Sequence, residues 1–222
     1  MSKRIVVAID GPAGAGKSTI ARRIAEKLGF LYIDSGAMYR AVALWAIRNG
    51  TSLEDAPHLE QLAINANISL SPGQVLLNEE DVSAAIRTPE VSAAASRVAA
   101  IGGVRRALVD KQRTYSETSS VVMEGRDIGS VVFPSAQVKI FLDASAGERA
   151  KRRQLEAGGD EQEVVSQITE RDARDRSRAE SPLMQSPDAI YVDSDGKSVD
   201  EVEEEILRII RSRTSNGKEF HR

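Results

Sequence analysis

The sequence contains no cysteine, few aromatic residues and no long apolar run, and each absence excludes a class of protein. With Cys 0, neither a disulfide scaffold nor a thiolate metal site can form. Aromatic residues make up 4% of the chain, too few for a platform that stacks single-stranded bases. No apolar run approaches the ~18 residues that a membrane span needs. The chain starts Met1-Ser2-Lys3-Arg4 and continues directly into a strand-like run, so a cytoplasmic protein without a signal peptide is expected.

The chain also lacks an excess of positive charge. Its 30 Lys plus Arg residues face 33 Asp plus Glu, and the net charge of −3 argues against the cationic field that non-specific nucleic-acid binders use. No nucleic-acid partner is therefore expected. The cations are nevertheless unequal, with 22 Arg against 8 Lys, and arginine suits bidentate binding of phosphate. With 41% hydrophobic residues, the 222 residues suffice for one globular domain, and a monomer is expected.

The first part of the chain has the pattern of an α/β protein. Residues 5–9 form a β-branched apolar run, typical of a strand buried on both faces. A glycine-rich loop follows, and Ile20, Ile24 and Leu28 then recur at helical spacing as far as Gly29. A second apolar run closes at Asp34, so strand, loop, helix and strand predict a right-handed βαβ unit. The later apolar runs at 121–123, 138–142 and 190–192 resume this rhythm.

A different pattern interrupts the rhythm in the middle of the chain. Two short apolar runs, 68–70 and 75–77, flank a Pro72-Gly73 turn and predict a β-hairpin. Residues from about 62 to 104 are therefore predicted to form an insertion with a small antiparallel sheet and Ala-rich helices. Near the end of the chain, Ser198 and Glu201 predict a capping box at the start of the last helix.

The strongest motif is Gly11-Pro12-Ala13-Gly14-Ala15-Gly16-Lys17-Ser18, which matches G-x-x-x-x-G-K-[ST]. Its glycines let successive backbone N–H groups turn toward phosphate oxygens. Lys17 would reach the β- and γ-phosphates, and the Ser18 hydroxyl would ligate Mg²⁺. Because the motif follows a predicted strand and opens a predicted helix, it predicts a site for a nucleoside triphosphate with Mg²⁺. A glycine-rich turn that binds nothing is the alternative.

A phosphate loop alone does not separate GTPase switches, motors and small-molecule kinases. The guanine-specific pattern N-K-x-D is absent, since the nearest string, Asn78-Glu79-Glu80-Asp81, lacks the lysine. A motor needs a transduction element, for which 222 residues leave little room. A kinase has to bring two anionic substrates together, which requires cations between them. The excess of arginine favours this interpretation.

Two arginine-bearing segments follow predicted strands, at the ends where α/β sheets bind ligands. In the segment 34–40, Tyr39 and Arg40 are predicted in the first turn of a helix. In the segment 124–129, glycines on both sides of Arg126-Asp127 predict a tight turn that presents both side chains. A helix cap with a solvated arginine, and a simple surface turn, remain the respective alternatives.

A third segment, 171–178, contains four arginines and no lysine. Arg171, Asp175 and Arg178 fall at i, i+4 and i+7, which predicts a single stripe on one helix face. Such a stripe suits either anion recognition or a solvated face laced with salt bridges.

Taken together, these motifs resemble those of the bacterial cytidylate kinases, a branch of the nucleoside monophosphate (NMP) kinases. They occur in order at 11–19, 34–40, 125–129 and 171–178, the last followed by Pro182-Leu183. The resemblance implies an α/β fold, a P-loop three-layer sandwich with a parallel central sheet, in a single kinase domain over 1–222. An NMP-binding insertion at about 62–104 and a small helical lid at about 155–175 complete it. The implied reaction is ATP plus CMP or dCMP giving ADP plus CDP or dCDP, with Mg²⁺.

The resemblance also implies the site residues. ATP would be bound by Gly11, Pro12, Ala13, Gly14, Ala15, Gly16, Lys17, Ser18 and Thr19. Ser35, Tyr39, Arg40 and Arg126 would surround the CMP phosphate and sugar, Ser96, Arg105 and Asp127 would read cytosine, and Arg171, Asp175 and Arg178 would hold the ribose and the phosphates. Lys17, Arg126, Arg171 and Arg178 would be catalytic. The base assignment is chemically reasonable, because cytosine offers an amino donor beside two acceptors, which a carboxylate and an arginine complement.

One position departs from the family pattern. Glu124 stands before Gly-Arg-Asp, where the family often has Asp, so its carboxylate reaches one methylene further. The acceptor phosphate is already largely ionised near pH 7, so no general base is required. His58 and His221 lie in no motif and are expected at the surface.

Two questions stay open at this point. The arginines ahead of the lid, at 149, 152 and 153, either contact ATP or decorate a helix. The alternative function is a P-loop regulatory NTPase whose arginine stripe docks a protein partner. Hydrolysis of ATP without a small-molecule acceptor would favour it.

Overall fold

Residues 4–158 and 161–214 are described by the computed structural model, in which the chain divides into two units. The first unit comprises Met1–Tyr32 and Thr118–Arg222, and the second comprises Ile33–Glu117. Residues 159 and 160 of the predicted lid, and His221, lie outside the described residues. Within the described part of the chain, no helix combines the length and the apolar character that crossing a membrane requires.

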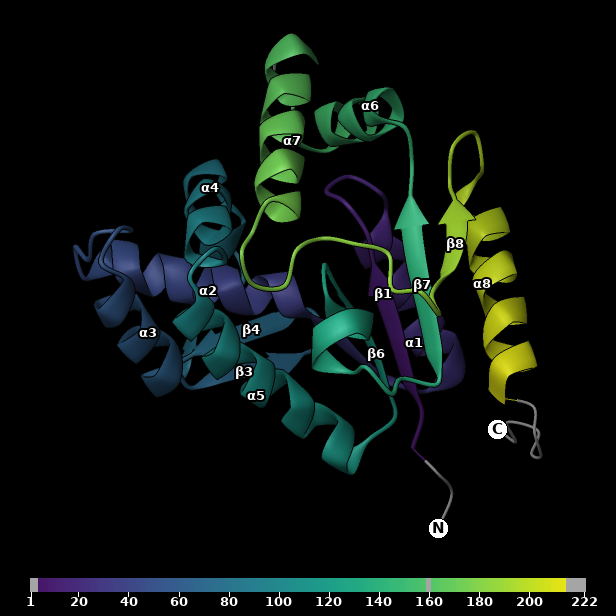
Figure 1. Cartoon of the computed structure of the whole chain (residues 1–222), viewed down its shortest axis with the longest axis horizontal. Helices are drawn as coiled ribbons and strands as arrows, with labels where there is room; N and C mark the ends of the chain where they lie inside the picture. The colour runs from purple at the N-terminus through teal and green to yellow at the C-terminus, as the bar shows by residue number, and fades with distance from the viewer. Residues whose placement is uncertain (1–3, 159–160, 215–222) are drawn as a thin grey trace. The chain divides into compact units, whose positions relative to one another are not determined.

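The first unit is built on a five-stranded sheet with the strand order β2-β6-β1-β7-β8 (Figure 1). The strands are β1 (Val6–Asp10), β2 (Leu31–Asp34), β6 (Val121–Gly125), β7 (Val138–Asp143) and β8 (Ile190–Asp193). Strand β1 pairs in parallel with both β6 and β7, and β7 pairs in parallel with β8. The predicted parallel α/β sheet is confirmed. All five residues of β6 are buried, as expected of a strand covered on both faces.

The helices of this unit are α1 (Lys17–Leu28), α6 (Ala146–Ala157), α7 (Glu161–Arg176) and α8 (Val199–Thr214), with a short π-helical turn at Ile128–Val132. Helix α1 ends at Gly29, as predicted, because that glycine adopts φ 65° and its N–H closes the last turn. The predicted capping box is also confirmed, since the Ser198 N–H donates to Glu201 Oε2 at 2.8 Å and the Glu201 N–H to Ser198 Oγ at 3.3 Å. Helices α1 and α8 share one apolar core with the sheet.

The register of the sheet brings the ends of three strands together. Asp10, the last residue of β1, lies opposite Gly125 of β6 on one side and Phe141 of β7 on the other. The glycine-rich loop after β1 therefore begins beside the segment that carries Arg126. In a parallel α/β sheet this edge is where ligands bind.

The second unit combines helices with a small antiparallel sheet. Its elements are α2 (Ser35–Arg48), α3 (Ala56–Asn65), β3 (Ile68–Ser71), β4 (Gln74–Leu77), β5 (Glu80–Asp81), a 3₁₀ turn (Ala85–Arg87), α4 (Pro89–Val98) and α5 (Gly102–Thr118). The predicted hairpin is confirmed, since Ile68 lies opposite Leu77 and Ser71 opposite Gln74. The short strand β5 extends it to three strands.

Candidate active site

The glycine-rich loop connects β1 to α1 and is shaped by close contact with other backbone segments. Gly11 adopts φ 150°, and a Cβ atom there would lie 1.9 Å from the carbonyl oxygen of Leu142. Gly14 has φ 79°, and its Cβ would lie 2.9 Å from the carbonyl oxygen of Arg149. Glycine is therefore required at both positions, and the loop is held against β7 and α6.

Lys17 is buried at the start of α1 and is surrounded by other cations. Its side chain is turned back onto the loop, where Nζ donates to the Pro12 carbonyl oxygen at 2.6 Å. Burial, and after it the charge of Arg126, lowers the pKa of Lys17 to about 7. Glu124 and Asp10 act in the opposite direction, but they do not compensate fully. The site therefore favours an added anion.

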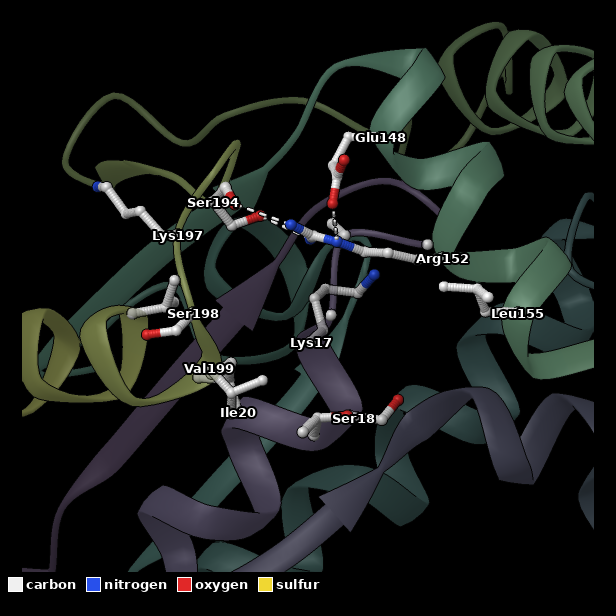
Figure 2. Close-up of a pocket in the computed structure, with 15 residues that line it drawn as sticks. Lys17, Ser18, Ile20, Glu148, Arg152, Leu155, Ser194, Lys197, Ser198 and Val199 are labelled. Carbon is white, nitrogen blue, oxygen red and sulfur yellow. Dashed lines mark hydrogen bonds and ion pairs between the residues drawn. The ribbon is translucent and has the colours of Figure 1, made fainter.

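A cavity of about 460 Å³ lies beside this loop (Figure 2). Loop and helix residues 14–20 form one wall, and the rest is lined by Glu148, Arg152, Leu155, Ser194, Lys197, Ser198, Val199 and Val202. Arg152 crosses the cavity wall, where its Nη1 donates to Ser194 Oγ at 2.9 Å and its Nε donates to Glu148 Oε1 at 2.9 Å. The phosphate loop therefore opens into a space with both polar and apolar walls, as a nucleoside requires.

Most of this lining was not predicted from the sequence. Arg152 is one of the three arginines for which the sequence leaves contact with ATP open. Glu148, Leu155 and Val199 also line the cavity but belong to no motif. One signal was available, because Ser194 directly follows the last residue of β8, at the strand end where α/β sheets bind ligands.

Asp175 pairs with one arginine of the predicted stripe and with one from the segment 124–129. Arg126 Nε donates to Asp175 Oδ2 at 2.9 Å, and Arg178 pairs with Asp175 Oδ1. Burial by itself would raise the pKa of Asp175, but the charges of Arg126, Arg178 and Arg171 together hold it below its usual value. Arg126 and Arg171 also lower the pKa of Lys17, so these predicted residues share one electrostatic site.

The stripe itself differs from the prediction. Helix α7 ends at Arg176, so Arg178 does not lie on the helix at i+7. The chain turns after Ser177, and the Leu183 N–H donates to the Asp175 carbonyl oxygen at 2.8 Å. Arg178 reaches Asp175 from this turn rather than from the helix face.

Asp10 is a buried carboxylate that the sequence did not single out. Its Oδ1 accepts from the Ile128 N–H at 2.7 Å, and its Oδ2 accepts from the Gly129 N–H at 2.8 Å. Burial raises the pKa of Asp10 to about 6, although the two N–H donors act to lower it. Asp10 thus joins the end of β1 to the segment after Arg126.

The tight turn predicted around Arg126 and Asp127 is wrong in its detail. Neither Gly125 nor Gly129 has a positive φ, and the chain enters the π-helical turn instead. Asp127 is 4% exposed, so the segment does not present that side chain to solvent. The reason is the carboxylate of Asp10, which takes the first two N–H groups of the turn and draws it into the protein.

Glu124, the position that departs from the family pattern, is buried at the end of β6. Its exposed fraction is 4%, and Tyr32 donates its hydroxyl to Glu124 Oε1 at 2.7 Å. The carboxylate also acts to raise the pKa of Lys17. Its longer side chain is therefore held in place by Tyr32 and lies within the electrostatic reach of the phosphate loop.

The second unit carries the remaining predicted residues. Ser35, with an exposed fraction of 4%, is the first residue of α2, so Tyr39 and Arg40 lie in the second helical turn and not the first. The N-cap is Asp34, which accepts from the Ala37 N–H at 3.0 Å with one oxygen and from Arg40 Nη2 at 2.6 Å with the other. Arg40 is therefore fixed by the residue that begins its own helix.

Tyr39 also meets Arg105 in this unit. Arg105 is 2% exposed, its Cζ lies 5.3 Å from the centre of the Tyr39 ring, and its Nη1 donates to the Ala99 carbonyl oxygen at 3.1 Å. Ser96, on α4, is 4% exposed. Of the residues assigned to cytosine, the structure thus describes Ser96 and Arg105 in the second unit and Asp127 in the first.

The fold and these features define a P-loop phosphotransferase: a parallel α/β sheet, a phosphate loop that opens into a cavity, and arginines gathered beside the loop lysine. The family model described as cytidylate kinase matches residues 7–212. The chain belongs to the cytidylate kinase family.

Comparisons with individual proteins agree. The chain is 59% identical over 225 residues to a cytidylate kinase of Solibacter usitatus, covering 98% of this chain and 97% of that protein. It is 48% identical to a bifunctional pantoate ligase/cytidylate kinase of a Synechococcus strain, covering 94% of this chain and 41% of that longer protein. A solved gluconokinase from Sinorhizobium meliloti, 14% identical, shares the fold with a TM-score of 0.53 over 96% of this chain and 95% of that one.

Proposed function

We propose that this protein transfers the γ-phosphoryl group of ATP to CMP or dCMP, giving ADP and CDP or dCDP. The observation that carries the proposal is the group of arginines around Asp175, beside Lys17. A nucleoside triphosphatase needs cations for the phosphates of one nucleotide. A kinase also has to neutralise the phosphate of its acceptor. Membership of the cytidylate kinase family narrows the acceptor to a cytidine nucleotide. No observation favours a regulatory NTPase.

We assign the donor to the phosphate loop and the adjoining cavity. Residues 11–19 would bind the phosphates through backbone N–H groups, and Lys17 would give up its bond to Pro12 for a phosphate oxygen. The cavity of about 460 Å³ would take the adenosine part of ATP.

The donor set suits Mg²⁺ as the accompanying ion. Ser18 lines the cavity with an exposed side chain at the start of α1. No group of three or more His, Cys, Asp or Glu side chains forms a metal cage within the ranges that the structure describes. Mg²⁺ typically binds through one or two protein oxygens together with phosphate oxygens and water, so a single hydroxyl is sufficient. When bound, the ion would neutralise charge on the phosphates.

We assign the acceptor to the residues that the motifs indicate. Ser35, Tyr39, Arg40 and Arg126 would hold the phosphate and sugar, Ser96, Arg105 and Asp127 would bind cytosine, and Arg171, Asp175 and Arg178 would bind the ribose and the phosphates in transfer. Several of these side chains are held in place by neighbours within their own unit, as the pairs Arg40–Asp34 and Arg126–Asp175 illustrate. Preorganised cations of this kind stabilise the charge of a loose phosphoryl-transfer transition state.

The chemistry does not require a general base. The acceptor phosphate, with a second pKa of about 6, is already largely ionised near pH 7. His58 is exposed on α3, as predicted. Positioning and electrostatic stabilisation by Lys17 and the arginines would supply most of the rate enhancement.

A comparison of acceptors tests this function. ADP release is measured with ATP, Mg²⁺ and, in turn, CMP, dCMP, UMP, AMP, dTMP and shikimate. The expected result is that CMP or dCMP gives the highest kcat/KM. Equal or better turnover of a non-cytidine acceptor would overturn the substrate assignment, and ATP hydrolysis that is independent of every acceptor would overturn the kinase assignment.

Substitution of Asp127 is expected to weaken discrimination between bases. Uracil carries an oxygen where cytosine carries its amino group. A carboxylate that faces this oxygen cannot form a hydrogen bond with it, which costs about 1–3 kcal/mol. Asp127→Ala should therefore reduce the ratio of kcat/KM for CMP over UMP by about 5-fold to 150-fold. Asp127→Asn, whose amide can donate to the uracil oxygen, should reduce it at least as far. An unchanged ratio in both variants would mean that cytosine is read elsewhere.

Binding of ATP is expected to take up a proton above neutral pH. With a pKa of about 7, Lys17 is mostly neutral at pH 8 in the ligand-free protein. Phosphate oxygens raise that pKa, so Lys17 becomes charged on binding and up to about one proton is taken up. Calorimetric titrations in two buffers of different ionisation enthalpy give the number of protons. At pH 6, where Lys17 is already charged, the uptake should vanish, and equal uptake at both pH values would contradict the assignment.

A further inference from the structure

Arg149 is a buried arginine that does not line the nucleotide cavity. It lies in the first turns of α6, and its side chain is 7% exposed. Its Nε donates to the Ala144 carbonyl oxygen at 3.0 Å, and its Nη1 donates both to the Ala13 carbonyl oxygen at 3.0 Å and to Asp172 Oδ2 at 2.5 Å. One guanidinium thus joins the phosphate loop, the segment after β7, and helix α7.

The contact with Ala13 affects the shape of the phosphate loop. The loop binds phosphate through N–H groups that point inward, which requires that its carbonyl groups point away and find other donors. Arg149 is such a donor for Ala13. The next residue, Gly14, packs so closely on the same helix turn that an added Cβ would lie 3.0 Å from Arg149 Cβ. The start of α6 therefore supports the loop from behind.

The contact with Asp172 affects the position of α7. Asp172 is 4% exposed and lies between Arg171 and Asp175 on this helix. Since an α-helix behaves as a rigid rod over one turn, fixing Asp172 also fixes its two neighbours. Figure 1 shows α7 beside α6, and among the side chains that the structure describes, Ala150, Val164 and Ile168 form an apolar cluster of these two helices. The buried ion pair adds a charged link between α6 and α7 to this apolar contact.

We propose that Arg149 and Asp172 are positioning residues for phosphoryl transfer, which hold the phosphate loop and the Arg171–Asp175 turn of α7 at one fixed separation. The inference rests on the proposed kinase function. It gives Arg149 a role other than ATP binding. It also gives a role to Asp172, which lies in the motif at 171–178 but was assigned none above. A displacement of about 1 Å in such a site costs on the order of 100-fold in rate.

Steady-state kinetics of Arg149→Ala, Asp172→Ala and the double variant, with ATP and CMP each varied, provide the test. Each single variant should lower kcat about 10-fold to 100-fold and change either KM by less than about threefold. The double variant should be little worse than either single one, because both remove the same link. Asp172→Asn, which keeps an acceptor for Arg149, should recover most of the activity. Lys151→Ala, an exposed position on the same helix, is the matched control.

Several results would overturn the proposal. A raised KM for ATP with unchanged kcat would make Arg149 a nucleotide ligand. A lowered Tm with unchanged kcat well below Tm would make the pair purely structural. Additive losses in the double variant would show two separate roles. If the alanine variants do not fold, Arg149→Lys serves instead, and wild-type kinetics in that variant would reject the proposal.

A second measurement separates this proposal from the proposed function. Amide hydrogen exchange is compared between the wild-type protein and Arg149→Lys without substrates. The peptides covering 11–19 and 171–176 should exchange faster in the variant, and those of α8 should not change. Unchanged exchange in both segments would reject the link, even if the enzyme proves to use another acceptor. Absence of CMP turnover in the wild-type protein, with faster exchange in the variant, would reject the function alone.

Discussion

A Lys17→Ala variant is expected to fold normally, and its turnover is expected to be about 10³-fold lower than that of the wild-type protein. The lysine would supply the charge closest to the phosphates, and burial, followed by the charge of Arg126, lowers its pKa to about 7. Removing it should reduce the stability of the folded protein little near neutral pH, because within the described residues Nζ donates one hydrogen bond, to the Pro12 carbonyl oxygen. The losses should appear in kcat/KM for ATP, measured by ADP release in the presence of CMP.

Thermal unfolding and a matched substitution complete this experiment. Lys151→Ala removes an exposed lysine from α6 and should leave both Tm and turnover unchanged. For Lys17→Ala, the expected Tm lies within a few degrees of the wild-type value. Turnover within tenfold of wild type would remove Lys17 from the site.

In an Arg126→Ala variant, kcat is expected to be about 10²-fold to 10³-fold lower than in the wild-type protein. Arg126 Nε pairs with Asp175 Oδ2 at 2.9 Å. Among the neighbouring charges, that of Arg126 also has the largest effect on the pKa of Lys17. Without it, the pKa of Lys17 should rise. The proton uptake on ATP binding at pH 8 should then become smaller than in the wild-type protein. A calorimetric titration measures this second effect independently of turnover.

Arg176→Ala is the control for this variant. Arg176 is exposed in the last turn of α7, close in sequence to the same cluster, and should be replaceable without effect on kcat. Arg126→Lys keeps the charge but loses the planar guanidinium, so an intermediate rate is expected. Equal activity of Arg126→Ala and Arg176→Ala would mean that the cluster around Asp175 has a structural role only.

The local parts of this site could be predicted from the sequence. The strand before the phosphate loop, the helix that it opens and the glycine that ends the helix depend on residues close together in the chain. Backbone conformation at such positions follows from short-range sterics and hydrogen bonds. The motif around Lys17 and the hairpin around Gly73 were predicted for this reason.

Other parts depended on packing between distant segments. The buried carboxylate of Asp10 accepts from Ile128, 118 residues away, so nothing near it in the sequence indicates its partner. Asp10 accepts from the first two N–H groups of the π-helical turn at Ile128–Val132, and Asp127 is buried directly before that turn. The position of Arg178 likewise depends on where α7 ends, and helix ends are weakly defined by sequence.

The three arginines ahead of the predicted lid illustrate the same limit. Helical periodicity places residues 149, 152 and 153 at i, i+3 and i+4, on one side of α6, but it does not say which neighbour each side chain meets. In the structure, Arg149 supports the phosphate loop and Arg152 lines the nucleotide cavity. Arg153, by contrast, is exposed. Chemically identical side chains acquire different roles from their surroundings alone.

The sequence by itself therefore determined the parallel α/β class and the place of the phosphate loop between β1 and α1, because these follow from periodicity and from local motifs. Only the tertiary structure showed that Arg126 and Arg178 both pair with Asp175, that Asp10 accepts from the turn after Arg126, and that Arg149 links the phosphate loop to Asp172. Arg126 and Asp175 are 49 residues apart, and Arg149 and Ala13 are 136 residues apart. Contacts over such separations are set by how the sheet and its helices pack, and this arrangement is a property of the whole unit and not of any single segment.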